Sequence, residues 1–272
     1  MVRLNRPLLY IDLDGVLMFT HVSLINLFFL CLAGFFAALV DSIAGGGGII
    51  SLPAYLFAGV PTHAALGTNK FSSTAGSFTS SCKFIKSGKV DFSILKYLIP
   101  FTLLGAVLGV NVVMKVNQAF LSTLVLVLIL FVGIYTLFSK NIGLKDRKLP
   151  VTKHRLLLGI ILAFSLGFYD GFFGPGTGSF LIFGIISIFG YNFVKAGANA
   201  KLLNFFSNLA SLVMFALKGQ IYYLVGLPVA VSMIAGAQVG THLALKNGSK
   251  FIKPIFVTMS LAVAVKLLVK YI

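Results

Sequence analysis

Two stretches of sequence decide how this chain folds: Asp41-Ser-Ile-Ala-Gly-Gly-Gly-Gly48 and Asp170-Gly-Phe-Phe-Gly-Pro-Gly-Thr-Gly178. Each begins with an aspartate at the end of an apolar run and continues into a glycine-rich segment. Glycine permits positive φ angles, and Pro175 removes a backbone N–H and stops a helix from continuing. Both stretches therefore predict that an apolar helix breaks soon after an acidic residue.

The composition around these stretches excludes a water-soluble protein. The chain has 272 residues, of which 58% are hydrophobic and 10% charged, and its mean hydropathy is +1.01. A soluble domain carries about 25% charged residues. We therefore expect an all-α polytopic membrane protein whose surroundings are the lipid bilayer. Because each span uses ~20 residues, no room remains for a soluble catalytic domain, and we expect no enzyme.

Apolar runs along the chain predict eight to ten transmembrane segments. Two of these runs are too short to cross a bilayer as straight helices, which indicates half-helices or re-entrant elements. The short runs are 49–60 and 177–190. The others are 20–41, 65–85, 94–114, 118–138, 156–171, 196–217, 222–245 and 252–270.

The net charge of +16 is distributed as in a membrane protein, so we expect no nucleic-acid partner. Basic residues gather in the loops, and loops rich in Lys and Arg stay on the cytoplasmic side of a membrane. One such loop surrounds Gly88, and a second is the linker 139–155. Both loops are therefore expected to face the cytoplasm.

The chain consists of two copies of one unit. Asp41 and Asp170 are 129 residues apart, and after a two-residue slip a spacing of 131 residues relates the rest of the copies. The predicted parts are an N-terminal lead-in (1–19), a first membrane repeat (20–138), a basic cytoplasmic linker (139–155) and a second membrane repeat (156–272). Pairs in the second register include Lys70/Lys201, Gly88/Gly219, Gly105/Gly236, Gly109/Gly240, Lys115/Lys246 and Phe120/Phe251. Glycines spaced as at 105 and 109 let membrane helices approach closely.

Loop charge also predicts the relative orientation of the two copies. The loop near Gly88 is rich in lysine, whereas its counterpart near Gly219 carries only Lys218, and the bias is reversed after Lys115 and Lys246. Equivalent loops thus favour opposite sides, which predicts inverted repeats around a site at the membrane midplane. A parallel arrangement with four spans per copy is the alternative.

The lead-in contains Tyr10-Ile-Asp-Leu-Asp-Gly-Val16, which imitates the nucleophile motif of haloacid-dehalogenase-type phosphatases. That motif needs a following α/β domain, whereas membrane helix follows here. We therefore interpret residues 1–19 as a non-cytoplasmic or interfacial segment. The apolar run after it lacks a small-residue cleavage signature and is expected to be a retained first span.

Four charged residues are expected inside the membrane. Asp41, Asp170, Lys70 and Lys201 occupy matching places in the two copies. A charge at the bilayer centre costs at least ~2.5 kcal/mol, so such residues pair with one another or line a cavity. The lysines are predicted to bind a ligand, and the aspartates to form ion pairs or to couple transport to protons.

The helix breaks and the helices after them complete the predicted site. Free N–H groups at a helix N-terminus favour an anion, and polar side chains at i, i+3 and i+7 share one helical face. The four histidines share no metal spacing, so neither a metal site nor a cofactor is predicted. The predicted substrate-binding residues are Lys70, Lys201, Asn69, Asn204, Gly46, Gly47, Gly48, Gly176, Thr177 and Gly178, with Ser73, Ser77 and Asn208 on the polar helix face.

Four motifs resemble the sulfite exporter TauE/SafE family of membrane permeases, and more narrowly its enterobacterial inner-membrane branch. The resemblance runs from about residue 27 to the C-terminus and leaves out the lead-in. It implies a multi-pass inner-membrane carrier for sulfur-containing anions such as sulfite or organosulfonates, although that branch brings no assigned substrate. The motifs are Asp41-Ser-Ile-Ala-Gly-Gly-Gly-Gly, Ala65-Leu-Gly-Thr-Asn-Lys70, Gly167-Phe-Tyr-Asp-Gly-Phe-Phe-Gly-Pro175 and Ala200-Lys-Leu-Leu-Asn204.

The sequence therefore predicts a transporter of small anions that works by alternating access, with proton coupling through the aspartates. A passive anion channel on the same broken helices and a membrane assembly protein are the alternatives. Flux that saturates and supports counterflow would distinguish a transporter from a channel. Homo-oligomerisation is left open.

Overall fold

The computed structural model describes residues 8–11, 17–20, 22–121, 123–124, 127 and 149–271, with the backbone alone at 8–11, 17–20 and 248–271. Most of the predicted segment 118–138 and of the linker 139–155 lies outside the described residues, as do Asp12 and Asp14 of the lead-in. The predicted domain boundaries therefore stay predictions.

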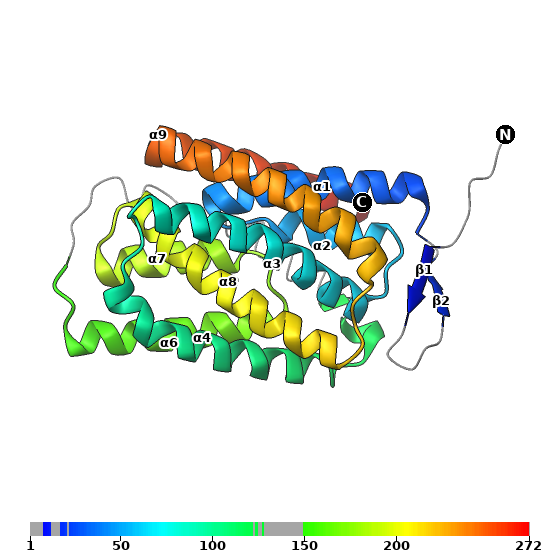
Figure 1. Cartoon of the computed structure of the whole chain (residues 1–272), viewed down its shortest axis with the longest axis horizontal. Helices are drawn as coiled ribbons and strands as arrows, with labels where there is room; N and C mark the ends of the chain where they lie inside the picture. Colours follow the sequence, from blue (N-terminus) through cyan, green and yellow to red (C-terminus); the bar gives the residue numbers. More distant parts are fainter. Residues whose placement is uncertain are drawn as a thin grey trace.

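Eight helices of the described chain pack into one bundle, and a short hairpin lies beside it (Figure 1). The strands of the hairpin, β1 (Leu8–Ile11) and β2 (Leu17–Thr20), pair antiparallel. The first-copy helices are α1 (Leu24–Ala44), α2 (Gly48–Phe57), α3 (Thr62–Lys86) and α4 (Phe92–Val113). The second-copy helices are α6 (Lys153–Phe172), α7 (Thr177–Phe189), α8 (Phe193–Leu217) and α9 (Tyr223–Tyr271).

Local sequence sets where several of these helices begin. A side-chain oxygen at the N-cap accepts a backbone N–H of the first turn, which satisfies a group that the helix leaves unpaired. Ser23, Asp91, Thr152 and Asn192 do this for α1, α4, α6 and α8. These caps fix the helix starts within a few residues of the predicted ones.

The expected all-α polytopic membrane protein is confirmed. Five described helical stretches are long and apolar enough to span a bilayer: α1, α4, α6, α8 and residues 223–247 of α9. Helices α2 and α7 have only 10 and 13 residues, as predicted for the short segments. One prediction differs, because the runs 222–245 and 252–270 lie within a single uninterrupted helical run, α9. The reason is local: Gly248 between them costs a helix only about 1 kcal/mol, too little to end it.

Equivalent helices make equivalent contacts across the two copies. Helix α1 packs along α9, and its counterpart α6 packs along α4. A Cβ added at Gly236 would stand 2.1 Å from the Phe35 carbonyl oxygen, and one added at Gly105 would stand 2.3 Å from the Phe164 carbonyl oxygen. The predicted role of these glycines in close helix packing is confirmed, since no side chain fits there.

Helices α3 and α8 cross antiparallel at the centre of the bundle. Lys70 near the start of α3 bonds to Asn208 in the second half of α8, whereas Ser81 near the end of α3 bonds to the Lys201 carbonyl near the start of α8. Backbone conformation repeats as well, because the turns after these helices have positive φ, 68° at Gly88 and 64° at Gly219. Whether the copies are inverted in a bilayer stays a prediction.

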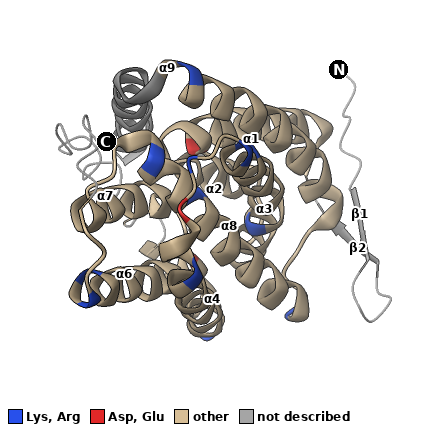
Figure 2. Ribbon diagram, turned by 60° about the vertical axis from the view of Figure 1, so that its left-hand side comes forward, with Lys and Arg blue, Asp and Glu red and all other residues tan. Residues whose placement is uncertain are grey.

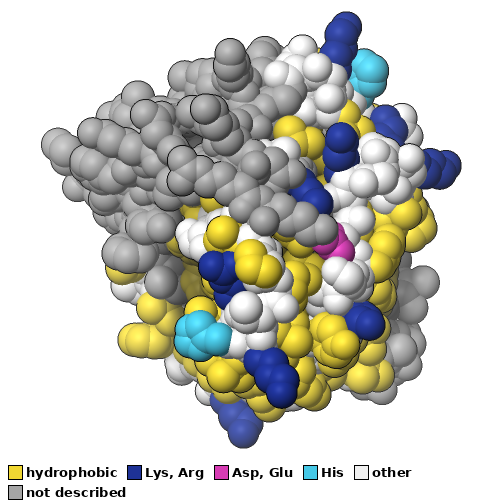
Figure 3. Space-filling model, turned by 90° about the vertical axis from the view of Figure 1, so that its left-hand side faces the viewer, with side chains coloured by type: hydrophobic (Ala, Val, Ile, Leu, Met, Phe, Trp, Pro, Cys, Tyr) yellow, Lys and Arg dark blue, Asp and Glu magenta, His cyan; other side chains and the backbone are white. Residues whose placement is uncertain are grey.

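Apolar side chains cover much of the outside of the bundle, as a lipid-facing surface requires. Phe28, Leu104 and Leu227 have 66%, 57% and 60% of their surface exposed. Figure 3 views one end of the bundle, where Lys and Arg side chains lie around apolar ones and far outnumber acidic side chains.

Candidate functional site

Both predicted helix breaks are present. Helix α1 ends at Ala44, the left-handed residue Gly45 follows with φ 81°, and α2 begins three residues later at Gly48. Helix α6 ends at Phe172, and Gly174 and Gly176 adopt φ 99° and 84° before α7 begins. The positive φ angles explain the glycines, because an L side chain is strained in this region.

The two breaks cross in direct backbone contact. A Cβ added at Gly45 would lie 2.3 Å from the carbonyl carbon of Gly178. Ser179 donates its backbone N–H to the Gly45 carbonyl at 3.0 Å and its hydroxyl to the Ala44 carbonyl at 3.1 Å. The N-terminus of α7 therefore satisfies carbonyl groups that the end of α1 leaves unpaired.

A buried ion pair joins α3 of the first copy to α6 of the second. The Lys70 Nζ lies 2.8 Å from the Asp170 Oδ2, and the two side chains are 4% and 2% exposed. Asn208 accepts a second hydrogen bond from the Lys70 ammonium at 2.9 Å. Ser207 donates its hydroxyl to the Asp170 Oδ2 at 2.5 Å. Both charges are thus paired and further hydrogen-bonded, as buried charges require.

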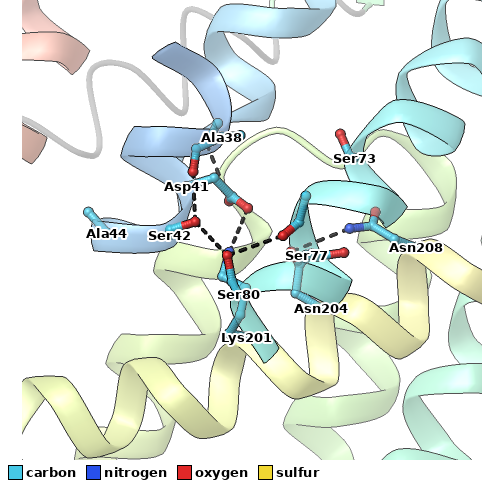
Figure 4. A network of polar contacts seen from close by, with 12 residues as sticks. Ala38, Asp41, Ser42, Ala44, Ser73, Ser77, Ser80, Lys201, Asn204 and Asn208 are labelled. Atoms are coloured by element: carbon cyan, nitrogen blue, oxygen red, sulfur yellow. Dashed lines mark hydrogen bonds and ion pairs between the residues drawn. The ribbon is translucent and has the colours of Figure 1, made fainter. Parts of the chain in front are cut away.

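The equivalent ion pair joins α8 of the second copy to α1 of the first. The Lys201 Nζ lies 2.5 Å from the Asp41 Oδ2, while the Asp41 side chain keeps 23% of its surface exposed. Its other carboxylate oxygen accepts only a long bond from the Gly47 N–H, at 3.4 Å. Figure 4 shows this pair beside the Ser42–Ser80 hydrogen bond.

Each lysine is thus paired with the aspartate of the opposite copy. The sequence predicted that the aspartates neutralise the lysines but did not assign the partners. Figure 2 shows acidic residues with basic residues beside them in the middle of the bundle. The cross-pairing places all four charges around one centre, between helices that are far apart along the chain.

A small cavity lies at this centre, with about 30 Å³ open to the centres of water-sized molecules. It is lined by Ala37, Ala38, Asp41, Gly45, Gly47, Gly48, Ser51, Asn69, Lys70, Ser73, Gly76, Ser77, Asp170, Gly174, Gly176, Gly178, Asn204, Asn208 and Met233. Most of the predicted site residues are therefore brought together, from both copies. Three are not part of the lining: Lys201 lies behind Asp41, Gly46 lies in the first break, and Thr177 is the first residue of α7.

Backbone donors remain available at the breaks. The backbone N–H groups of Gly46, Gly48, Gly176 and Gly178 make no hydrogen bond to another described residue. Three of these glycines line the cavity. Free N–H groups at the starts of α2 and α7 carry the positive ends of the helix dipoles, which suits an anion.

The predicted polar faces of α3 and α8 also reach the cavity. Asn204 accepts a long bond from the Asn208 amide at 3.4 Å, and Ser73 lies 3.5 Å from the Asn69 Oδ1. Ser77 donates to the Thr74 carbonyl within its own helix. These amides and hydroxyls keep donors and acceptors free for a ligand, because each makes fewer bonds than its inventory allows.

Sequence reasoning missed Ser207 and Met233. Ser207 binds Asp170, but the residue at its equivalent position in the first copy is Gly76, so the duplication offered no signal for it. Met233 lines the cavity from α9 within an apolar run that looks like any lipid-facing helix. Within the described part of the chain, no three His, Cys, Asp or Glu residues lie close enough together to hold a metal ion.

The part of the chain that matches known proteins includes both helix breaks and the residues that line the cavity. The profile of a family described as "Sulfite exporter TauE/SafE" matches residues 30–267. The "Probable membrane transporter protein" of Haemophilus influenzae is 39% identical over 234 residues, which cover 86% of this chain and 91% of that protein. The "Probable membrane transporter protein YfcA" of Escherichia coli is 36% identical over 256 residues, 94% of this chain and 93% of that protein.

A further relative, the "Probable membrane transporter protein ORF9" of a Sinorhizobium species, is 39% identical over 243 residues, 88% of this chain and 91% of that protein. No solved structure matches this chain. The family match spans nearly the whole helical bundle and includes all four buried charges. This multi-pass membrane protein therefore belongs to the sulfite exporter TauE/SafE family.

Proposed function

We propose that this protein is a transporter of small oxyanions, with sulfite and organosulfonates as the expected substrates, in the inner membrane of the cell. The observation that carries the proposal is the cavity between the two crossed helix breaks, which presents Lys70 and the free N–H groups of three glycines. The family description names a sulfite exporter, and the relatives are named membrane transporters.

The donors around the cavity fit an oxyanion better than a cation or an apolar ligand. Glycine N–H groups, an ammonium and the amides of Asn69 and Asn204 all donate hydrogen bonds. Charge-assisted bonds from such donors to an anion are roughly twice as strong as neutral ones. The small volume favours an ion of a few heavy atoms, because one water already needs about 10–15 Å³ of this kind of space.

Alternating access between inverted repeats is the mechanism that the arrangement supports best. Helices α3 and α8 are equivalent members of the two copies and run antiparallel. If both cross the bilayer, the pseudo-two-fold axis that relates them lies in the membrane plane, as in inverted-repeat transporters. The cavity lies where the equivalent elements meet, so rocking of one copy against the other would expose it to each side in turn.

The buried charges are proposed to control the binding of substrate. In the ion-paired state each lysine is neutralised by an aspartate of the other copy. Protonation of an aspartate would free positive charge for the anion, and this exchange would couple anion movement to protons. Lys70, Lys201 and the asparagines then attract the substrate, while Asp41 competes with it for Lys201.

Flux of radiolabelled sulfite into proteoliposomes tests the proposal. We expect Lys70→Ala to lower the flux at least tenfold, because a charge-assisted contact contributes roughly 1.5–3 kcal/mol. Asn69→Ala, which leaves both ion pairs intact, is expected to lower it less. Lys86→Ala, at an exposed position in the last turn of α3, is the matched control and should keep the flux. Unchanged flux in both cavity variants, with normal behaviour in size-exclusion chromatography, would exclude the proposed binding site.

A further inference from the structure

The two buried ion pairs differ in their access to the cavity and to water. The Asp170 side chain is 2% exposed, and its Oδ2 is held by the Lys70 ammonium and by the Ser207 hydroxyl. The Asp41 side chain is 23% exposed, and its only short bond is to Lys201. Both carboxylates line the cavity, but Asp41 is the one with surface left for exchange with water.

The charges at the site balance to zero before a substrate binds. Lys70, Lys201, Asp41 and Asp170 form two pairs, and every other described residue of the cavity lining is neutral. A singly charged anion would therefore bring an uncompensated negative charge into a buried site. Such a charge is unfavourable in a site with little water, so a compensating proton is favoured.

The geometry points to Asp41 as the residue that takes up this proton. A proton from the open side would bind a carboxylate oxygen of Asp41, break its ion pair, and leave the Lys201 ammonium unneutralised behind the cavity. We propose that each singly charged oxyanion is carried together with one proton on Asp41, in an electroneutral cycle, while Lys70–Asp170 stays paired. This inference rests on the proposed transport function and specifies its substrate charge and its stoichiometry.

With one proton available on Asp41, the charge of an anion decides whether the site accepts it. A doubly charged anion would need a second proton to keep the site neutral. Asp170 is the other carboxylate among the described residues of the cavity lining, and its proton would have to displace both Lys70 and Ser207 from a side chain that is only 2% exposed. Monoanions such as alkylsulfonates are therefore favoured over dianions such as sulfate.

Three charged groups among the described residues lie near Asp41. Lys201 faces it from α8, and Lys70 lies within electrostatic reach of it on α3, with Asp170 of α6 behind. Helices α2, α7 and α9 also pack against α1, and their described residues contribute no charged side chain to the cavity lining. Within the described part of the chain, Asp41 therefore belongs to a network of four charged residues.

Methanesulfonate is the probe that tests the proposal, because it keeps a single negative charge at every pH of interest. In proteoliposomes of the full chain, an inward proton gradient should drive its accumulation, and a pH-sensitive dye inside should report acidification. A membrane potential of either sign, imposed with valinomycin and potassium, should leave the uptake within about twofold, since an electroneutral cycle moves no net charge. Uptake that follows the potential without acidification would overturn the inference.

Matched variants assign the proton to one carboxylate. Asp41→Asn imitates the protonated state, so we expect loss of proton-driven accumulation while exchange of labelled for unlabelled methanesulfonate continues at every pH. Asp170→Asn is the equivalent change in the other pair, and whatever uptake it retains should still be driven by the proton gradient. The reverse pattern, with accumulation surviving in Asp41→Asn and failing in Asp170→Asn, would overturn the assignment to Asp41.

The outcomes separate this inference from the function on which it rests. If the wild-type chain transports sulfite and methanesulfonate but moves charge with them, only the electroneutral cycle fails. If it transports neither, nor sulfate, the proposed function fails and the inference with it. Preferential transport of sulfate over methanesulfonate would contradict the charge rule while leaving anion transport intact.

Discussion

The two ion pairs occupy equivalent positions in the two copies, yet their surroundings differ. Lys70–Asp170 is closed in by Ser207 and Asn208, whereas Lys201–Asp41 has one carboxylate partly exposed beside the cavity. The duplicated sequence repeats the charged residues, and the neighbours that were not repeated give each pair different hydrogen bonds and a different exposure. The same substitution at two equivalent positions can therefore be compared, with one copy serving as the control for the other.

The largest difference is expected when one lysine is removed. Lys70→Met leaves Asp170 charged with only 2% of its side chain exposed, which should cost ~3–5 kcal/mol of stability. Lys201→Met leaves Asp41 with 23% of its side chain exposed, so the loss should be smaller. Thermal unfolding in detergent measures both, and an equal loss of Tm would contradict the difference in burial on which the comparison depends.

The next largest effect concerns the helix contacts that the copies share. Gly105→Ala and Gly236→Ala each place a Cβ against a backbone carbonyl oxygen, at 2.3 Å and 2.1 Å, and should destabilise by about 1–3 kcal/mol. Gly197→Ala is the control, because a Cβ there meets only Ile182 at 4.0 Å. We expect the two close-packed variants to lose similar stability and the control to gain some. A markedly unequal loss would show that the copies do not pack alike.

A smaller difference in stability is expected between variants of Ser80 and Ser211, which occupy equivalent positions in the two copies. Ser80 of α3 pairs with Ser42 at 2.6 Å, whereas Ser211 of α8 is buried without a hydrogen-bond partner among the described residues. The position equivalent to Ser42 is Gly171, which carries no hydroxyl. Ser80→Ala should cost about 1 kcal/mol, and Ser211→Ala should be neutral or stabilising. Comparable destabilisation of both variants would indicate that Ser211 has a partner after all.

The smallest expected effect depends on pH and concerns two equivalent hydrogen bonds, one in each copy. Asn199 of α8 accepts the Asp91 N–H at 2.9 Å, and Thr68 of α3 accepts the Tyr222 N–H at 2.9 Å. Of the two donor residues, Asp91 is acidic and Tyr222 is not. Burial raises the pKa of Asp91, but hydrogen bonds from Ser93 and Tyr191 and the charge of Lys195 outweigh it, so its pKa lies below the ordinary value.

Because the pKa of Asp91 is lowered in the folded state, its contribution to stability is present above the unfolded pKa of ~3.9 and is lost as pH falls through the folded pKa. Asp91→Asn should therefore lower Tm at neutral pH, and its difference from wild type should shrink below about pH 4. Thr68→Ala should lower Tm by a similar amount at every pH. If the difference in Tm between Asp91→Asn and wild type stayed constant across this pH range, the charge of Asp91 would make no contribution to stability.

Much of the candidate site could be predicted from the sequence, because charges and glycines are rare and conspicuous in apolar helices. Asp41 and Lys70 were identifiable from their cost in a membrane and from their repetition at 170 and 201. Ser207 could not be found in this way, since serine is common in membrane helices and its equivalent residue is a glycine. The uninterrupted α9 was also not predicted, because hydropathy marks where apolar residues stop and not where hydrogen bonding stops.

Hydropathy, glycine and proline act locally along the chain, so the sequence was enough to predict a helical membrane protein with two broken helices and two Asp–Lys sets. The folded structure was needed to find that each lysine pairs with the aspartate of the other copy and that the Asp41 side chain is more exposed than that of Asp170. Such pairing depends on how α1, α3, α6 and α8 cross in space. Spacing along a chain fixes which residues share a helical face, whereas the packing of helices distant in sequence fixes which faces meet.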